Sequence, residues 1–380
     1  MRQVHWASWM SAVALAVAVS SSARADIASD RAAAIVEYPW VLAASVDSIG
    51  GADTVIQVSN TSDQPIDLHC FYDNANYHCT NTGEVCTAAE QCCGGSTGCG
   101  VCYPGWNETD FRVRLTPFQP LAWRASEGRY EFPIDGVLRV GRDGVSSNAG
   151  SRIPPVPENP FIGALKCIAV DADGNPKDSN VLIGEATLEN GFPGVFFDVA
   201  KYNAVGIQAI PGAVNEDRTL VLGGEGAEYN GCPNVLILNH FAEFAEDPVS
   251  EEGVQTQLVL VPCTEDLLRQ KPGGAVVQYL VYNEFEQRFS TSRPLQCQQA
   301  LYISEIDTTQ RERSVFSAGV LGTVTAQSRL TPIGNGLIGV AIESHDSVRL
   351  DPSTRVRINS GAFNLHFQGD REVSDQIILP

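Results

Sequence analysis

The sequence Asn-Val-Leu-Ile-Gly-Glu-Ala at residues 180–186 recurs as Asn-Gly-Leu-Ile-Gly-Val-Ala at residues 335–341. Phe161 and Phe316 are separated by the same offset, and no gap is needed between the two pairs of matches. Ordered matches at a constant offset indicate an internal repeat rather than a chance similarity of apolar residues. The sequence therefore predicts two tandem copies of one folding unit.

Weaker matches extend the repeat in both directions. The matched segments, first copy before second, are 40–42 with 258–260, 54–60 with 277–283, 201–204 with 357–360, and 220–222 with 377–379. We place the first copy at residues 38–223 and the second at residues 256–380. Residues 224–255 have no counterpart in this alignment, and we expect them to bridge the two units.

Apolar and polar residues alternate through both copies, for example at residues 111–115 and 363–367. This period is typical of half-buried strands. Amphipathic helical stretches are scarce, so the apolar face of each sheet has to be covered by a second sheet. The expected fold is all-β: two tandem, internally duplicated antiparallel β-sandwich domains, with a disulfide-rich insert at residues 71–106 of the first.

One short segment resembles a known family. The sequence Val-Ser-Asn-Thr-Ser at residues 58–62, followed by the apolar alternation at 66–68, resembles the first hairpin of immunoglobulin-like domains in bacterial exported proteins. The resemblance implies an antiparallel sandwich for each copy, the architecture that the strand alternation also predicts. It implies no particular activity.

Residues 1–25 have the pattern of a secretory signal peptide, with Arg2, an apolar stretch at 11–19, and Ala-Arg-Ala at 23–25 as the cleavage pattern. No later apolar run reaches the roughly 18 residues that a spanning helix needs. We therefore expect a secreted, periplasmic or cell-surface protein without membrane insertion. Its formal net charge of −20 disfavours nucleic acid as a partner, because binding to phosphate needs clustered Lys and Arg.

Seven of the 11 cysteines lie between residues 70 and 102. In an exported chain this density favours disulfides over metal binding, although Cys99 and Cys102 have the spacing of zinc ligands. The spacings of the last six resemble the framework of cystine-knot miniproteins. That resemblance implies three bridges: Cys79–Cys93, Cys86–Cys99 and Cys92–Cys102.

The remaining five cysteines lie outside the insert. Alternation along their strands turns Cys70 and Cys167 inward, and we prefer a bridge between the two sheets of the first copy. Cys263 pairs with either Cys232 or Cys297. The thiol that is left over is either buried and inert or links two chains.

Acidic side chains gather at residues 171–178. Three of them, together with the amide of Asn175, are calcium candidates, because hard oxygen ligands close together suit this ion: Asp171, Asp173, Asn175 and Asp178. The alternative is a hairpin turn, since Asp-Gly between strands is a turn signal by itself. We expect no cofactor other than calcium.

Two aromatic residues, Tyr103 and Trp106, follow the last cysteine of the insert. Exposed, they would bind a glycan or a protein partner; otherwise they pack the insert onto its sandwich. His240 lies near Glu243 and is the only histidine considered for acid–base or metal chemistry. Because His69 alternates with apolar residues, we expect it to face solvent.

No motif of a hydrolase, a nucleotide-binding protein or a metalloprotease is present. We predict an exported, non-catalytic surface or structural protein that acts in adhesion or binds a glycan or a protein. Two alternatives remain: a hydrolase whose site is assembled from loops, and an inhibitor that acts through the knot-like insert. The sequence does not determine the oligomeric state.

Overall fold

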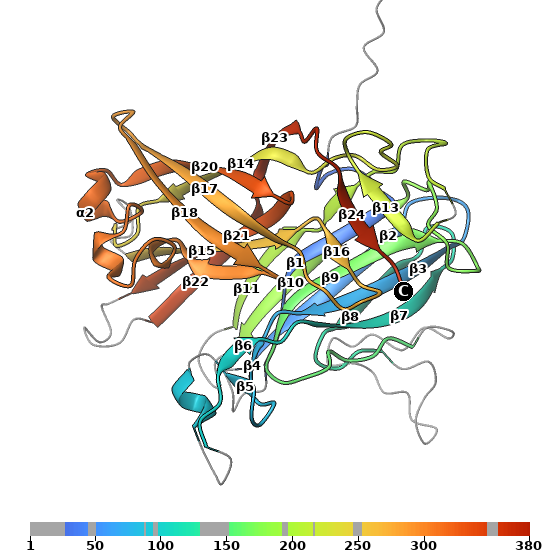
Figure 1. The fold of residues 1–380 in the computed structure, drawn as a ribbon, viewed down its shortest axis with the longest axis horizontal. Coiled ribbons are helices and arrows are strands. Elements are labelled where there is room, and N and C mark those ends of the chain that lie inside the picture. The colour runs from blue at the N-terminus through green and yellow to red at the C-terminus, as the bar shows by residue number, and fades with distance from the viewer. Residues whose placement is uncertain are drawn as a thin grey trace, which may run out of the picture.

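The structure, a computed structural model, describes residues 27–44, 51–86, 89–93, 98–129, 152–191, 197–215, 217–245, 253–347 and 356–380. These residues form almost only strands, which confirms the all-β fold. Two β-sandwiches lie side by side, each built from a five-stranded and a four-stranded antiparallel sheet (Figure 1). The predicted signal peptide lies outside the described residues. Within them, no helix is long and apolar enough to span a membrane.

The first sandwich has the sheets β12-β1-β9-β3-β7 and β11-β10-β2-β8. Its strands are β1 (Ile35–Ala43), β2 (Ala52–Asn60), β3 (Ile66–Asn74), β7 (Asn107–Leu115), β8 (Pro120–Arg124), β9 (Phe161–Val170), β10 (Leu182–Gly191), β11 (Phe197–Asn203) and β12 (Val205–Ile207). Between β3 and β7 the insert forms a small sheet of its own. It contains β4 (Tyr77–Cys79), β5 (Val85–Cys86), the 3-10 helix η1 (Ala89–Cys92) and β6 (Cys102–Pro104).

The second sandwich has the sheets β18-β17-β20-β14-β23 and β19-β15-β21-β22. Its strands are β14 (Pro233–Phe241), β15 (Gly253–Pro262), β17 (Gly274–Asn283), β18 (Arg288–Gln296), β19 (Gln299–Tyr302), β20 (Thr325–Gly334), β21 (Leu337–Ser347), β22 (Val356–Asn364) and β23 (His366–Asp370). Short helical turns follow β19: η3 (Ile303–Glu305), η4 (Arg311–Arg313) and α2 (Ala318–Leu321).

The two sandwiches share one strand order. When the strands of each sandwich are counted in chain order, the first strands β1 and β14 occupy the same position in their sheets. The same holds for β2 and β15, for β3 and β17, and for each later pair up to β12 and β23. Each unit is followed by one further strand, β13 (Thr219–Leu222) or β24 (Asp375–Ile378), and these two pair with each other. The insert occupies the place of the short turn between β17 and β18.

The topology corrects the front half of the sequence alignment. Residues 40–42 and 258–260 lie in β1 and β15, which are not counterparts, and 54–60 and 277–283 are displaced by one strand in the same way. The counterpart of β1 is β14, which lies within the segment 224–255 that we expected to be a bridge. The second sandwich therefore begins at β14. The alignment missed this strand because alternating apolar residues alone do not distinguish one front strand from the next.

The back-half matches join strands that are counterparts in the two sandwiches, and both strands hold a glycine where a side chain has no room. A Cβ on Gly184 would lie 2.0 Å from the Tyr38 hydroxyl and 3.0 Å from the carbonyl oxygen of Gln57 on β2, and one on Gly339 would lie 2.4 Å from that of Val259 on β15. At Gly184 the main obstacle is the Tyr38 side chain, whereas at Gly339 it is the backbone of the neighbouring strand. A steric requirement for glycine at both positions accounts for this match in the sequence alignment.

The first sandwich is buried on both faces of its five-stranded sheet. On β1, Tyr38 points into its own sandwich and donates a hydrogen bond to the Gln57 carbonyl of β2, whereas Ile35 and Glu37 point the other way and are also buried. Their cover is the outer face of β15 and β21, together with a small sheet in which β24 pairs with β13 and with β16 (Glu265–Asp266). One apolar cluster therefore spans both sandwiches.

Two disulfides lie within the sandwiches. Cys70 is bonded to Cys167, as preferred, but the two residues face each other on the neighbouring strands β3 and β9, so the bridge lies within one sheet and not between sheets. Cys232 is bonded to Cys263, one of the two pairings left open. Among the described residues Cys297 is the free cysteine, and it is buried.

The cross-strand bridge should contribute strongly to stability. Replacing both Cys70 and Cys167 by Ala should lower the free energy of unfolding by about 2–5 kcal/mol, because the unfolded chain loses a long closed loop. Denaturant unfolding without reductant measures this difference. The matched control is Cys297→Ala, which removes a buried sulfur but no bridge; an equal loss in both variants would contradict the prediction.

Candidate functional site

The disulfides of the insert differ from the cystine-knot pairing. The structure joins Cys79 to Cys92, Cys86 to Cys102 and Cys93 to Cys99. The pairing of β4 with β5 and β6 gathers Cys79, Cys86 and Cys102 on one side, and η1 brings Cys92 to them. Cys93, the next residue, turns away to form a bridge with Cys99. The predicted bridges Cys79–Cys93, Cys86–Cys99 and Cys92–Cys102 are therefore wrong.

These bridges also bear on the zinc alternative. A metal site needs at least three ligand atoms close together. In the described part of the chain, one group of His, Cys, Asp or Glu side chains has such atoms within 4.8 Å of one another: Cys79, Cys86 and Cys92. All three are in disulfides, and the spacing candidates Cys99 and Cys102 belong to two different bridges. A disulfide sulfur carries no thiolate with which to hold zinc.

The disulfide-rich insert, called the module below, is fixed to the first sandwich by Glu158. Its carboxylate accepts hydrogen bonds from Asn74 at 2.7 Å and from Asn76, and its Oε2 lies 2.9 Å from His78 Nε2. Burial alone would raise the pKa of Glu158, but the hydrogen bonds from His78 and the two amides hold it below its usual value. Gly105 allows this contact, because a Cβ there would lie 2.1 Å from His78 Nδ1.

The module carries exposed apolar side chains on one face. Tyr103 lies opposite His78 on the neighbouring strand, and its side is shared by Val101 and Val85. Val101 is 61% exposed and Tyr103 46%. Figure 1 shows β4, β5 and β6 projecting from the body of the molecule. The module therefore presents an apolar surface on a rigid, cross-linked frame.

The two aromatic candidates from the sequence have different environments. Trp106 is half-buried and packs against the apolar cluster of the first sandwich. Tyr103 remains exposed. The sequence predicted one role, binding or packing, for both aromatic residues. The structure assigns packing to Trp106, because this residue follows the module where the chain re-enters the sheet.

The calcium candidates form a turn. The Asp171 carboxylate accepts hydrogen bonds from the backbone N–H groups of Asp173 and Asn175, each at 2.9 Å, and from the Asn175 side chain at 3.2 Å. The hydrogen bonds from Asn175 are the main reason that the pKa of Asp171 is lowered. Asp178 instead accepts a hydrogen bond from the backbone of Gly212. Both oxygens of Asp171 thus hold the hairpin, as the turn alternative predicts.

His240 and Glu243 do not form an acid–base pair. His240 Nε2 lies 2.8 Å from Ser328 Oγ, and burial lowers the pKa of the imidazole to about 4. Glu243, also buried, accepts hydrogen bonds from the Thr256 backbone and from the Ser304 hydroxyl, and it pairs with Arg311 at 3.3 Å. Burial raises the pKa of Glu243. Both side chains have structural partners.

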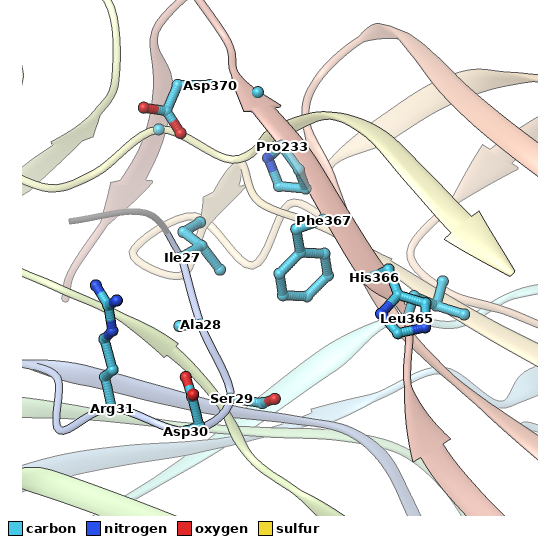
Figure 2. Close-up of a pocket in the computed structure, with 12 residues that line it drawn as sticks. Ile27, Ala28, Ser29, Asp30, Arg31, Pro233, Leu365, His366, Phe367 and Asp370 are labelled. Atoms are coloured by element: carbon cyan, nitrogen blue, oxygen red, sulfur yellow. The ribbon is translucent and has the colours of Figure 1, made fainter. Parts of the chain in front are cut away.

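A cleft of about 340 Å³ lies between the two sandwiches, where the segment that precedes β1 meets β23. Figure 2 shows Phe367 of β23 between Ile27 and His366, with Asp30 and Asp370 on different sides of the cleft. Its size is at the lower end of the range for small-molecule sites. His366 is exposed, as its place in the strand pattern predicts.

A wider groove of about 530 Å³ lies where β14 and β17 end and β20 begins, and Glu343 of the facing sheet also lines it. Register places Asn239, Gln327 and Tyr282 side by side on β14, β20 and β17. Gln327 donates a hydrogen bond to the Asn239 side chain at 3.1 Å, and Phe241 also lines the groove. Aromatic faces beside amide groups are able to stack on a sugar ring and to bind its hydroxyls.

Sequence analysis missed a buried ionic cluster between the sandwiches. Lys166 of β9 contacts Glu265 of β16, and its Nζ lies 3.6 Å from Glu37 Oε2 on β1. Asp73 of β3 is buried on the same face of the sheet. The signal was visible as a lysine within the apolar run of residues 161–170 and a glutamate within that of 35–43. Lys166 points away from its neighbour Cys167 and into the interface.

Burial dominates the electrostatics of this cluster. Loss of water raises the pKa of Glu37 to about 7, against the lowering influence of Lys166, and raises that of Asp73 strongly. Burial alone would lower the pKa of Lys166, but Glu265, Glu37 and Asp73 together raise it.

His69 is also buried, 2.7 Å from Asp110, so our expectation that it faces solvent was wrong.

No family model matches the chain, and no curated protein has a significantly similar sequence. Function therefore has to be argued from geometry. The five disulfides that the structure describes indicate an oxidising compartment.

The depressed pKa of His240 predicts a pH dependence. Between pH 6.5 and about 4 the unfolded chain binds a proton on this residue that the folded chain excludes, so stability should fall as the pH drops through this window. The loss should be roughly 3 kcal/mol at pH 4. Chemical denaturation at pH 7 and pH 4 measures it in the wild type and in His240→Gln. The variant should lose less between these two pH values, and parallel profiles would contradict the assignment.

Proposed function

We propose that the protein is an exported, non-catalytic surface protein that binds a protein partner through the apolar face of its module. The observation that carries the proposal is the exposure of Tyr103 and Val101 on a frame held by three disulfides. Small cross-linked units keep their shape without an apolar core, so side chains on them are pre-organised for binding. An exposed aromatic ring on such a frame is a typical anchor at protein interfaces.

Several features support an exported, structural role. The signal-like residues 1–25 and the disulfides agree on export to the periplasm, the cell surface or the medium. The shared strand order, together with the repeat at 180–186 and 335–341, supports an origin by internal duplication. The titratable groups that we considered for catalysis, His240 and Glu243, are buried and hydrogen-bonded.

The alternatives are less well supported. An inhibitor acting through a cystine knot loses its basis, because the pairing is different. A hydrolase would need convergent acid and base groups open to solvent, and His240 and Glu243 are 4% and 1% exposed.

Removal of the anchor tests the proposal. Tyr103→Ala combined with Val101→Ser should weaken binding to envelope protein fractions of the producing cell at least about tenfold, the range of an interface anchor. Binding of immobilised full-length protein, followed by identification of the captured protein, measures this effect. Phe285→Ala, an exposed aromatic on the β17–β18 turn, is the matched control. Equal binding by all three proteins would reject the module as the contact.

A second candidate function follows from the groove on the second sandwich. The row of Tyr282, Gln327 and Asn239 supports binding of a saccharide. Tyr282→Ala should abolish any signal on a glycan array, because stacking on the ring would be lost, while unfolding changes little since Tyr282 is only half-buried. Retained binding by the variant, or no binding by the wild type, would exclude the groove.

A further inference from the structure

The ionic cluster between the sandwiches has the composition of a reaction site rather than of a simple ion pair. Lys166 forms ion pairs with Glu265 and Glu37, and a third carboxyl group, that of Asp73, acts on it electrostatically. Lys166 and Glu37 are fully buried, and Asp73 and Glu265 are 4% exposed. This burial removes the side chains from bulk solvent, and an uncompensated buried charge is costly. The cluster therefore holds protons on some of its carboxyl groups.

Two of these carboxyl groups have no hydrogen-bond partner in the part of the chain that the structure describes. Both side-chain oxygens of Glu37 and of Asp73 are buried without a donor among the described residues. Buried polar atoms in folded proteins are nearly always hydrogen-bonded, so four such atoms around one amine call for an explanation. A group that must accept and release a proton during a reaction is one of the recognised exceptions.

The amine and one carboxyl group are held against each other by rigid elements. Lys166 lies on a central strand of the five-stranded sheet and is the cross-strand neighbour of Glu37. Glu265 pairs with Ile377 of β24, and the nearby Cys263 is anchored by its bridge to Cys232. The Glu265 side chain is the hydrogen-bond partner of Lys166. Such preorganisation gives an intramolecular reaction a large effective concentration of its partner.

We infer that Lys166 and Glu265 condense to an intramolecular amide bond, with Glu37 as the group that carries the proton. The inference does not depend on the proposed function, because it concerns the joint between the sandwiches. The driving force of this condensation is the loss of a buried ion pair, which is costly to keep away from solvent. The amide product is neutral, and the water released can leave the interface.

The reaction balances without an added reagent. The Lys166 ammonium gives a proton to Glu37, whose Oε2 is 3.6 Å from Nζ. The free amine then forms a bond to Glu265 Cδ, and one carboxyl oxygen of Glu265 departs with both hydrogens that the nitrogen has lost. Glu37 returns its proton to that oxygen, and one water molecule leaves. The raised pKa of Glu37, about 7, allows it to hold a proton near neutral pH and to release it again.

The product would be a covalent staple across the interface. It would join β9 of the first sandwich to β16 by a bond that no reductant breaks. Each of the five disulfides lies within one sandwich or within the module, so none of them links the two sandwiches covalently.

Mass spectrometry of the exported wild-type protein tests the inference directly. After reduction and denaturation, the intact chain should be lighter than its sequence by one water molecule. Proteolysis should yield one branched peptide that joins the segment around Lys166 to the segment around Glu265, with no cleavage by trypsin after Lys166. A full-mass chain that trypsin cleaves after Lys166 would overturn the inference, as would a branch at Glu37 or Asp73.

Two variants separate the roles. Glu37→Gln keeps the shape of the side chain but cannot carry the proton, so it should leave the chain at full mass while its disulfide map matches the wild type. A linked Glu37→Gln chain would remove Glu37 from the reaction. The double variant Lys166→Met with Glu265→Leu replaces both charges by apolar groups, supplies the unlinked reference, and should unfold at a lower temperature than the wild type. Equal unfolding temperatures would contradict a staple.

Discussion

Burial of the outer face of the first five-stranded sheet is the constraint on which the rest of the structure depends. A sheet in a sandwich normally buries one face, yet β1 and β9 are buried on both. On β1 and β9 the charged residues of this second face are Glu37 and Lys166, and the face is covered by β15, β21 and the small sheet that contains β24. Because that cover comes from the second half of the chain, the first sandwich cannot be separated without exposing a large apolar surface.

The same strand order leads to two different surfaces. In the first sandwich, Glu37 and Lys166 project from β1 and β9 into the interface. In the second sandwich the corresponding strands β14 and β20 carry Asn239 and Gln327, both exposed. The side-chain period of a strand places these residues on equivalent faces. One sandwich therefore supplies the joint, and the other keeps the corresponding polar residues exposed.

The sequence predicted the parts of the fold that depend on local chemistry. Alternation predicted the strands, and the match of Gly184 with Gly339 aligned the back halves, because at both positions a neighbouring group leaves no room for a side chain. The front half was displaced by one strand, since apolar alternation is the same in β1 and β2. Cys70 and Cys167 were paired correctly, but alternation cannot tell a partner in the same sheet from one in the facing sheet.

The candidate sites depended on contacts that no local pattern contains. The module was visible as a run of cysteines, whereas its pairing depends on how η1 turns Cys92 and Cys93 to opposite sides. Lys166 and Glu265 lie 99 residues apart in the chain, and only the packing of one sandwich on the other brings them together. Charged residues inside apolar strands were the available signal, because such residues are rarely fully buried unless paired.

The interface also determines where the module points. Cys297 Sγ lies 3.9 Å from the carbonyl oxygen of Asn74, the last residue of β3 before the module. Where the chain returns, Gln270 donates a hydrogen bond to the side chain of Glu108 at 2.9 Å. Both ends of the module are thus held by residues of the second half of the chain. A change that loosens the joint between the sandwiches would remove these two contacts and leave the module held by Glu158 on the first sandwich alone.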